Sequence, residues 1–127
     1  MKLMKNQILN MHKMLIAQTG GTDGIRDHNL LDSAVNGAFQ TFDKIDIYPS
    51  LEEKAAKLAF SIIKNHPFID GNKRIGLYVM LVFLELNGCE LNYTQQELID
   101  LGLGVADSSI NDIMLLQWVQ NHLPNKY

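Results

Sequence analysis

The chain has 127 residues, of which 46% are hydrophobic and 20% charged, and its net charge is -3 at pH 7, as is ordinary for one globular domain. The acidic balance disfavours a nucleic-acid partner, and the most apolar stretch, residues 75–86, is shorter than the about 20 residues of a bilayer span. A single cysteine, Cys89, cannot form an internal disulfide, and the four histidines lack metal-ligand spacing. We expect one cytoplasmic domain over residues 1–127, with neither a nucleic-acid nor a membrane partner.

Two amphipathic helices are predicted at the start of the chain. Apolar residues recur at helical spacing at Met4, Ile8, Met11 and Leu15. This pattern predicts a helix from about residue 5 to residue 18 that stops at Gly20-Gly21. Asp27 can cap a second helix, whose apolar stripe we extend from Leu30 to Phe42.

Residues 44–48 alternate between polar and apolar, with Ile45 and Ile47 on one face and Pro49 closing the segment. The alternation is typical of a short strand or one arm of a hairpin. An ordinary loop is the alternative.

A third helix is predicted to begin at Leu51, because Ser50 and Glu53 have the spacing of a capping box. Its apolar series, continued by one step, arrives at His66. Pro67 disfavours helical geometry at the residue before it. We therefore expect the helix to end at His66, with the imidazole at its rim on the inward side.

Three more helices follow. Residues 71–86 are almost all apolar beyond the first turn and predict a buried central helix. Thr94 and Glu97 form a second capping box, which predicts a fifth helix, and Ser108 or Ser109 can start a sixth that ends before Pro124. Six helices with at most one hairpin indicate an all-α fold.

The segment His66 to Arg74, HPFIDGNKR, joins the third helix to the central one and carries the polar residues of chemical interest. A helix N-terminus presents unpaired N–H groups and the positive end of the macrodipole, which together favour an anion such as phosphate. Cations there oppose the dipole, so Lys73 and Arg74 in the first turn indicate a ligand rather than a folding role.

Each residue type then has a chemical role in such a site. The imidazole of His66 can take a proton from an alcohol near neutral pH. The carboxylate of Asp70 is a hard oxygen ligand for Mg²⁺. Phosphate-binding groups are then supplied by Gly71, Asn72, Lys73 and Arg74, with Gly71 allowing close approach of the backbone and Arg74 acting as a bidentate clamp.

Taken singly, these residues also have structural interpretations. His66 can stabilise the last carbonyls of a helix, Asp70 can be an N-cap, and Lys73 and Arg74 can form a solvated pair. The combination at this spacing favours the functional reading. A P-loop is excluded, because no Gly-x4-Gly-Lys-Ser/Thr sequence occurs.

The segment HPFIDGNKR resembles the signature of the Fic/Doc family, His-x-Phe-x-Asp/Glu-Gly/Ala-Asn-x-x-Arg, in the Doc form that ends Asn-Lys-Arg. Gly20-Gly21, residues 27–39 and residues 83–88 are similar to Doc segments in the same order. The resemblance implies a compact six-helix Fic/Doc fold, with the 43–48 segment in the place of a flap that aligns the target. It also implies that His66 is the base, that Asp70 helps to hold Mg²⁺, and that residues 72–74 hold the phosphates of ATP.

Lys73 followed by Arg74 resembles the kinase branch of the family, whose activity is phosphorylation of elongation factor Tu on a threonine. The resemblance therefore implies a Doc-like toxin that transfers the ATP γ-phosphate to a Ser or Thr hydroxyl. Its inhibitor would be a separate small antitoxin, because no Ser/Thr-x3-Glu-Gly/Asn inhibitory segment is found. Two alternatives stay open: adenylyl transfer with attack on the α-phosphate, and a binding module without catalysis.

Overall fold

The computed structural model describes residues 1–124. In these residues the chain forms six α-helices and one small antiparallel sheet of two strands, so the predicted all-α class with a short hairpin is confirmed. The elements in chain order are α1 (Lys5–Thr19), α2 (His28–Phe39), β1 (Thr41–Phe42), β2 (Ile45–Asp46), α3 (Leu51–Asn65), α4 (Asn72–Leu86), α5 (Gln95–Ala106) and α6 (Asp112–Asn121).

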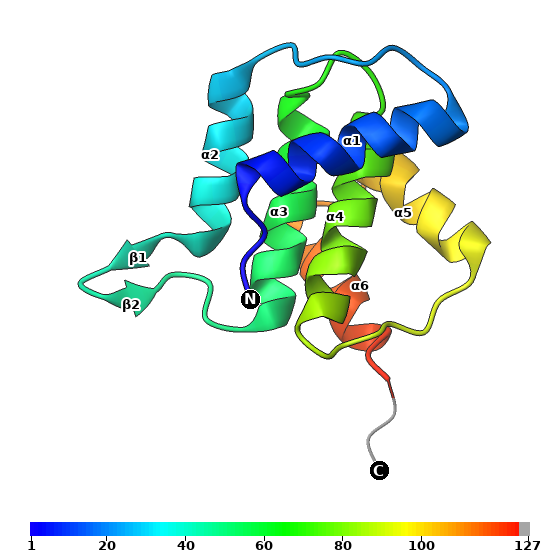
Figure 1. Ribbon diagram of the computed structural model, residues 1–127. Coiled ribbons are helices and arrows are strands. Elements are labelled where there is room, and N and C mark those ends of the chain that lie inside the picture. The colour runs from blue at the N-terminus through cyan, green and yellow to red at the C-terminus, as the bar shows by residue number, and fades with distance from the viewer. Residues whose placement is uncertain (125–127) are drawn as a thin grey trace.

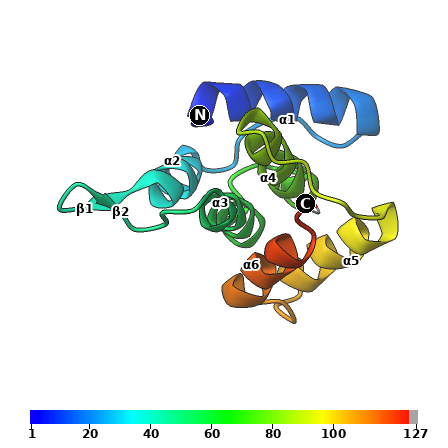
Figure 2. The same cartoon turned by 90° about the horizontal axis from the view of Figure 1, so that it is seen from below.

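Helices α3 and α4 form the most extensive helix pair and lie at the centre of the molecule. Figure 2 shows α1 on one side of this pair and α5 and α6 on the opposite side, while α2 flanks α3. The central pair can approach closely because Gly76 of α4 faces Ile63 and the carbonyl of Ala59 in α3. Both the α1–α2 and the α3–α4 connections lie at the same end of this pair (Figure 1).

The predicted helix starts depend on side-chain caps that the structure contains. Asp27 accepts hydrogen bonds from two backbone N–H groups of the first turn of α2. The capping boxes of Ser50 with Glu53 and of Thr94 with Glu97 are both closed in each direction. These caps satisfy N–H groups that have no partner within the helix, which explains why local sequence was enough to place the three starts.

The hairpin is real, but it begins earlier than predicted. Phe42 was expected on the apolar stripe of the second helix; instead it lies in β1, pairs with Ile45 and is 79% exposed. The helix ends at Phe39 because Gln40 is extended, and Asp43 and Lys44 both adopt positive φ at the turn. Two such residues give the turn a twist that matches paired strands. Figure 1 shows the hairpin projecting away from the helices.

The start of the sixth helix was predicted two or three residues too early. Asp107 accepts a hydrogen bond from the backbone of Ser109, and Ser108 has a φ of 69°, so this segment is a turn. The cap is Asn111, whose side chain accepts from the backbone N–H of Met114. Ser and Asn are both good N-cap residues, and the turn at Ser108 determines that Asn111 caps the helix.

The buried face of α1 also differs from the expected stripe. Its buried residues are Ile8, His12 and Ile16, while Met4 is 59% exposed. His12 is therefore buried, whereas the apolar pattern predicted that its neighbour Met11 would lie on the buried face. Among residues 1–124, no helix combines the length and apolar character needed to cross a membrane.

Candidate active site

All six predicted site residues line one cavity of about 480 Å³ between the end of α3 and the start of α4. They are His66, Asp70, Gly71, Asn72, Lys73 and Arg74, and Ile69 and Ala106 complete the lining. The α3–α4 connection supplies the first three, and the first turn of α4 supplies the others. Site residues that are close in sequence thus also lie around one cavity.

His66 is the first residue after α3 and has a left-handed backbone, with φ 51° and ψ 57°. We expected its side chain on the inward side of the helix. The structure instead leaves His66 exposed at the edge of the cavity, because the left-handed turn rotates it away from the apolar stripe. Within the described residues, no hydrogen bond is made by its imidazole, so both ring nitrogens are available to a ligand.

The N-terminus of α4 has the properties of an anion site. Its N-cap is Gly71, with a φ of 77°, which provides no side-chain cap, and no acidic residue lies in the first turn. Lys73 in the same turn is exposed. Free N–H groups, the helix dipole and this ammonium all favour negative charge at one point.

Asn72 is buried, with 9% of its surface exposed, and its amide is bonded to the preceding loop. Oδ1 accepts from the backbone N–H of Phe68, and Nδ2 donates to the carbonyl of Phe68, both at 3.0 Å. The side chain therefore closes the loop around Phe68, whose ring is buried in the core. Its backbone N–H, rather than its amide, belongs to the free start of α4.

Asp70 is held by backbone groups on both carboxylate oxygens. Oδ2 accepts from Thr22 at 3.1 Å, and Oδ1 accepts from Gly71 at 2.8 Å. These hydrogen bonds, with a smaller effect of the Arg74 charge, lower the pKa of Asp70 below its ordinary value. The carboxylate is thus ionised at neutral pH, and each oxygen keeps a lone pair for a cation.

The guanidinium of Arg74 is tied to the end of α1. Nη1 donates to the hydroxyl of Thr19 and to the carbonyl of Gly20, the latter at 2.8 Å. Nη2 lies 3.9 Å from Oδ1 of Asp70. Among the described residues Nε and Nη2 make no hydrogen bond, so this held side chain still has donors for an anion.

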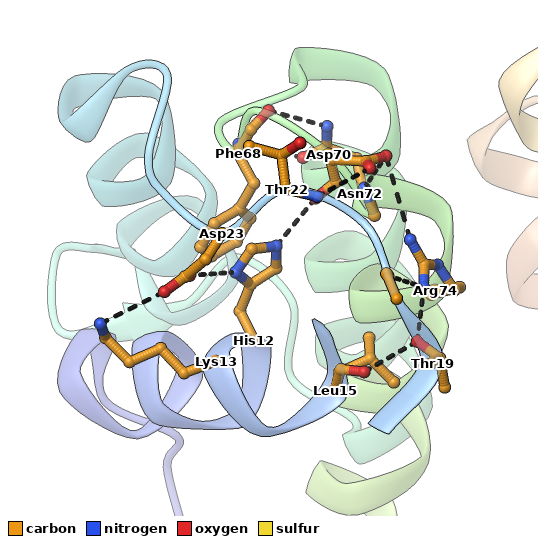
Figure 3. Close-up of polar contacts among 12 residues, drawn as sticks. His12, Lys13, Leu15, Thr19, Thr22, Asp23, Phe68, Asp70, Asn72 and Arg74 are labelled. Atoms are coloured by element: carbon orange, nitrogen blue, oxygen red, sulfur yellow. Dashed lines mark hydrogen bonds and ion pairs between the residues drawn. The ribbon is translucent and has the colours of Figure 1, made fainter. Parts of the chain in front are cut away.

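The α1–α2 connection forms the other wall of the site, which sequence reasoning missed. His12 of α1 donates from Nε2 to the carbonyl of Asp70 at 2.8 Å and stacks on Phe68, with ring centroids 3.8 Å apart. Figure 3 shows His12 and Thr22 meeting the Asp70 loop from the α1 side. The available signal was the spacing of His12 between Ile8 and Ile16 on one helix face.

Arg26, in the same connection, contacts the opposite end of the loop. It donates from Nε to the carbonyl of His66 at 2.6 Å and from Nη2 to that of Asn65 at 2.8 Å. We had assigned no function to it. Nothing in the local pattern distinguishes this arginine from a solvated one, because its partners are 39 and 40 residues away.

A second hollow of about 420 Å³ adjoins the same two cations, Lys73 and Arg74. Its other walls are mostly apolar side chains of α4 and α5, among them Leu77, Leu98 and Leu103. The cations therefore stand between a polar cavity and an apolar one.

Comparison with known protein families matches residues 2–84 to the Fic/DOC family. The chain belongs to this family. It is 43% identical over 72 residues to a protein named Toxin Doc from Mycolicibacterium smegmatis, a match that covers 57% of this chain and 55% of that protein. It is 30% identical over 105 residues to Protein kinase doc of Escherichia phage P1, covering 83% of this chain and 82% of the relative. Both relatives support the Doc type that the signature indicated.

Proposed function

We propose that this Fic/Doc protein is a Doc-type toxin that transfers the γ-phosphate of ATP to a Ser or Thr hydroxyl of a translation factor resembling elongation factor Tu. The observation that carries the proposal is the single cavity that holds an unbonded imidazole, an uncapped helix start with two cations, and an ionised carboxylate. The names of the two relatives, a Doc toxin and a Doc protein kinase, support the same activity.

The phosphates of ATP would bind the free N–H groups at the start of α4, where Gly71 has no side chain to obstruct them. Arg74 would contact them through its remaining donors, and Lys73 would offset the charge on the phosphate being transferred. The adjoining apolar hollow suits a ligand that carries an aromatic base as well as phosphate.

Asp70 fits a role in holding Mg²⁺. Among residues 1–124, no three His, Cys, Asp or Glu side chains converge to hold a metal by themselves. Mg²⁺ is commonly bound by one carboxylate together with substrate phosphates, and Asp70 offers such a carboxylate in ionised form. When bound, the ion supplies positive charge that neutralises phosphate oxygens.

The chemical step then needs one base. His66 would accept the proton of the target hydroxyl as its oxygen forms a bond to the γ-phosphorus, while the bond to the bridging oxygen of ADP breaks. The exposed position of His66 at the cavity edge lets a protein hydroxyl approach it. A separate antitoxin protein would restrain the enzyme, as expected for a Doc-type toxin.

The test uses ATP labelled at the γ- or the α-phosphate, incubated with purified elongation factor Tu and, in parallel, with a cell lysate. We expect γ-label on a Ser or Thr of the target, no α-label, and loss of transfer in His66→Ala with nucleotide affinity retained. Lys73→Gly should sharply reduce transfer. Label from the α-position alone would replace the kinase by an adenylyltransferase, and nucleotide binding without any transfer would leave a binding module.

A further inference from the structure

A general base needs a defined position relative to the hydroxyl that it deprotonates. In many enzymes a third group orients the base through a hydrogen bond. Within the described residues, the imidazole of His66 makes no such bond. The direction in which its side chain leaves the chain is set by the backbone at His66.

That backbone is in an unfavourable conformation for a residue with a side chain. The left-handed φ of 51° at His66 is less favourable than the right-handed region, because Cβ approaches the carbonyl oxygen. The conformation persists only where surrounding contacts impose it. The N–H of His66 donates to the carbonyl of Ile62. Because Pro67 follows and has no backbone N–H, the helix cannot continue, and Pro67 donates no hydrogen bond to the end of the helix.

Arg26 contacts the backbone at this point. Its two hydrogen bonds go to the carbonyls of Asn65 and His66, which lie at the C-terminal end of α3 and have no partner within the helix. A guanidinium also complements the negative end of the helix dipole. One planar side chain thus fixes two successive peptide groups, and with them the direction in which the His66 side chain leaves the chain.

The backbone around Arg26 is fixed to the same loop. The N–H groups of Arg26 and Asp27 both donate to the carbonyl of Pro67, at 2.8 and 3.0 Å. Ile25 pairs with Phe68 in an isolated antiparallel bridge. Arg26 therefore reaches the α3 carbonyls from a support that is itself attached to the residues on the other side of His66.

We propose that Arg26 is a positioning residue of the transfer reaction, which holds the His66 backbone in its left-handed conformation and thereby places the imidazole at the edge of the cavity. The proposal rests on the proposed role of His66 as the base. Arg26 acts through His66 and contacts neither the nucleotide nor the phosphate-binding turn of α4.

The experiment compares Arg26→Ala and Arg26→Lys with wild type, using ATP and purified elongation factor Tu. Misplacement of a reacting group by about 1 Å costs roughly 100-fold in rate, so Arg26→Ala should lower kcat by about that factor. The KM for ATP should stay within about twofold, because the α4 start is untouched. Arg26→Lys should recover part of kcat, since an ammonium can donate to the same carbonyls in less favourable geometry.

Asp27→Ala is the matched control. It removes the α2 cap beside Arg26 and should lower the stability of the fold, while leaving both Arg26 bonds in place. We expect its kcat to remain near that of wild type. An equal loss of kcat in both variants would show that Arg26 has only a structural role and would overturn the proposal.

A double-mutant cycle identifies the group through which Arg26 acts. In a His66→Ala background, Arg26→Ala should leave the slow residual single-turnover rate unchanged, because the base it positions is gone. Additive losses would contradict positioning. If His66→Ala alone retained full transfer, the proposed function would fail instead, irrespective of Arg26.

A spectroscopic arm requires no substrate. In Arg26→Ala, the φ-dependent amide coupling of His66 measured by NMR should leave its left-handed value, while resonances of the α4 first turn stay unchanged. An unchanged coupling at His66 would overturn the proposal. Should Arg26→Ala fail to fold, the same coupling in Arg26→Lys and Arg26→Gln decides the question.

Discussion

The side-chain amide of Asn72 bonds the backbone of Phe68 in both directions, so one buried residue closes the loop that carries the candidate site. Removing both hydrogen bonds should lower the free energy of unfolding, because the net contribution of each bond is about 1 kcal/mol and the Phe68 groups left without a partner are buried. We predict that Asn72→Ala lowers the free energy of unfolding by about 2 kcal/mol.

Urea unfolding of the ligand-free protein checks this prediction. A loss of stability without nucleotide identifies the amide as a loop closure. A variant that is as stable as wild type, yet binds nucleotide poorly, would instead assign the amide to phosphate binding.

Gly21 and Gly20 form a natural pair of test positions, since both have positive φ but only at Gly21 would an added Cβ meet side chains of the site. A Cβ at Gly21 would lie 2.6 Å from Oδ2 of Asp70 and 3.1 Å from Nη2 of Arg74, whereas a Cβ at Gly20 meets nothing within 4 Å. Both alanine variants should lose about 1–3 kcal/mol of stability from backbone strain at positive φ. Gly21→Ala alone should also weaken binding of Mg²⁺-ATP, measured by calorimetric titration.

Equal affinities in the two variants would show that Asp70 and Arg74 have no part in binding. The comparison is sharper than replacing the charged residues, because neither glycine offers a side chain to the ligand.

His122 and Glu97 join the end of α6 to the start of α5 through a 2.8 Å contact. Burial opposes charge on the imidazole, but the bonds to Glu97 and to the Trp118 carbonyl outweigh it and raise the pKa of His122 above 6.5. The hydrogen bond to His122, aided by that to Thr94, lowers the pKa of Glu97 below 4.5.

The pH dependence follows from these two directions. A raised pKa of His122 contributes stability that is fully present below 6.5 and is lost as pH rises through the folded value. A lowered pKa of Glu97 contributes stability present above 4.5 and lost as pH falls through its folded value. The pair therefore stabilises most between these values, and wild type should lose stability from pH 6 to pH 8.

Urea unfolding across this range checks the direction. Glu97→Gln is the suitable variant, because Gln keeps the capping box while removing the charge. Its stability should fall less with rising pH than that of wild type. A parallel fall in both proteins would contradict the assignment to this pair.

Alanine should have opposite effects at two helical glycines, Gly76 in the close α3–α4 contact and Gly37 in α2. A Cβ at Gly76 would lie 2.7 Å from Cγ1 of Ile63 and 3.2 Å from the carbonyl oxygen of Ala59, whereas one at Gly37 meets only Lys57, at 3.6 Å. Gly76→Ala should destabilise by about 1–3 kcal/mol through overpacking. Gly37→Ala should stabilise by up to about 1 kcal/mol through helix propensity. Thermal unfolding measures both, and a gain at Gly76 would contradict the close approach.

Local chemistry made much of the fold predictable. Caps such as Asp27 and the Ser50–Glu53 box act within four residues, so the sequence alone places them. The start of α6 was misplaced because Ser109 and Asn111 are both good caps, and the choice depended on the left-handed turn at Ser108. Phe42 was misplaced because an apolar residue after a helix can extend its stripe or form a strand.

The site was predictable only along one segment. Residues 66–74 are contiguous, so their joint chemistry could be recognised before their positions were known. His12 and Arg26 reach that segment through bonds that span 58 and about 40 residues, and such pairings depend on how the helices pack. Asn72 was recognised, but its bonding to Phe68 required the loop conformation.

The connection between α1 and α2 has an unusual consequence for how the chain can vary in length. Surface connections between helices ordinarily accept inserted residues. Here Thr19 at the end of α1, with Thr22 and Arg26 of the connection, contacts three different points of the segment 66–74. One added residue would shift the register of every contact beyond it, separating Arg26 from its carbonyls while Arg74 remained bound to Thr19. The number of residues between the end of α1 and Asp27 therefore determines whether all these contacts to residues 66–74 can form together. Deletions or insertions in this connection should inactivate the protein while leaving all six helices of residues 1–124 able to form.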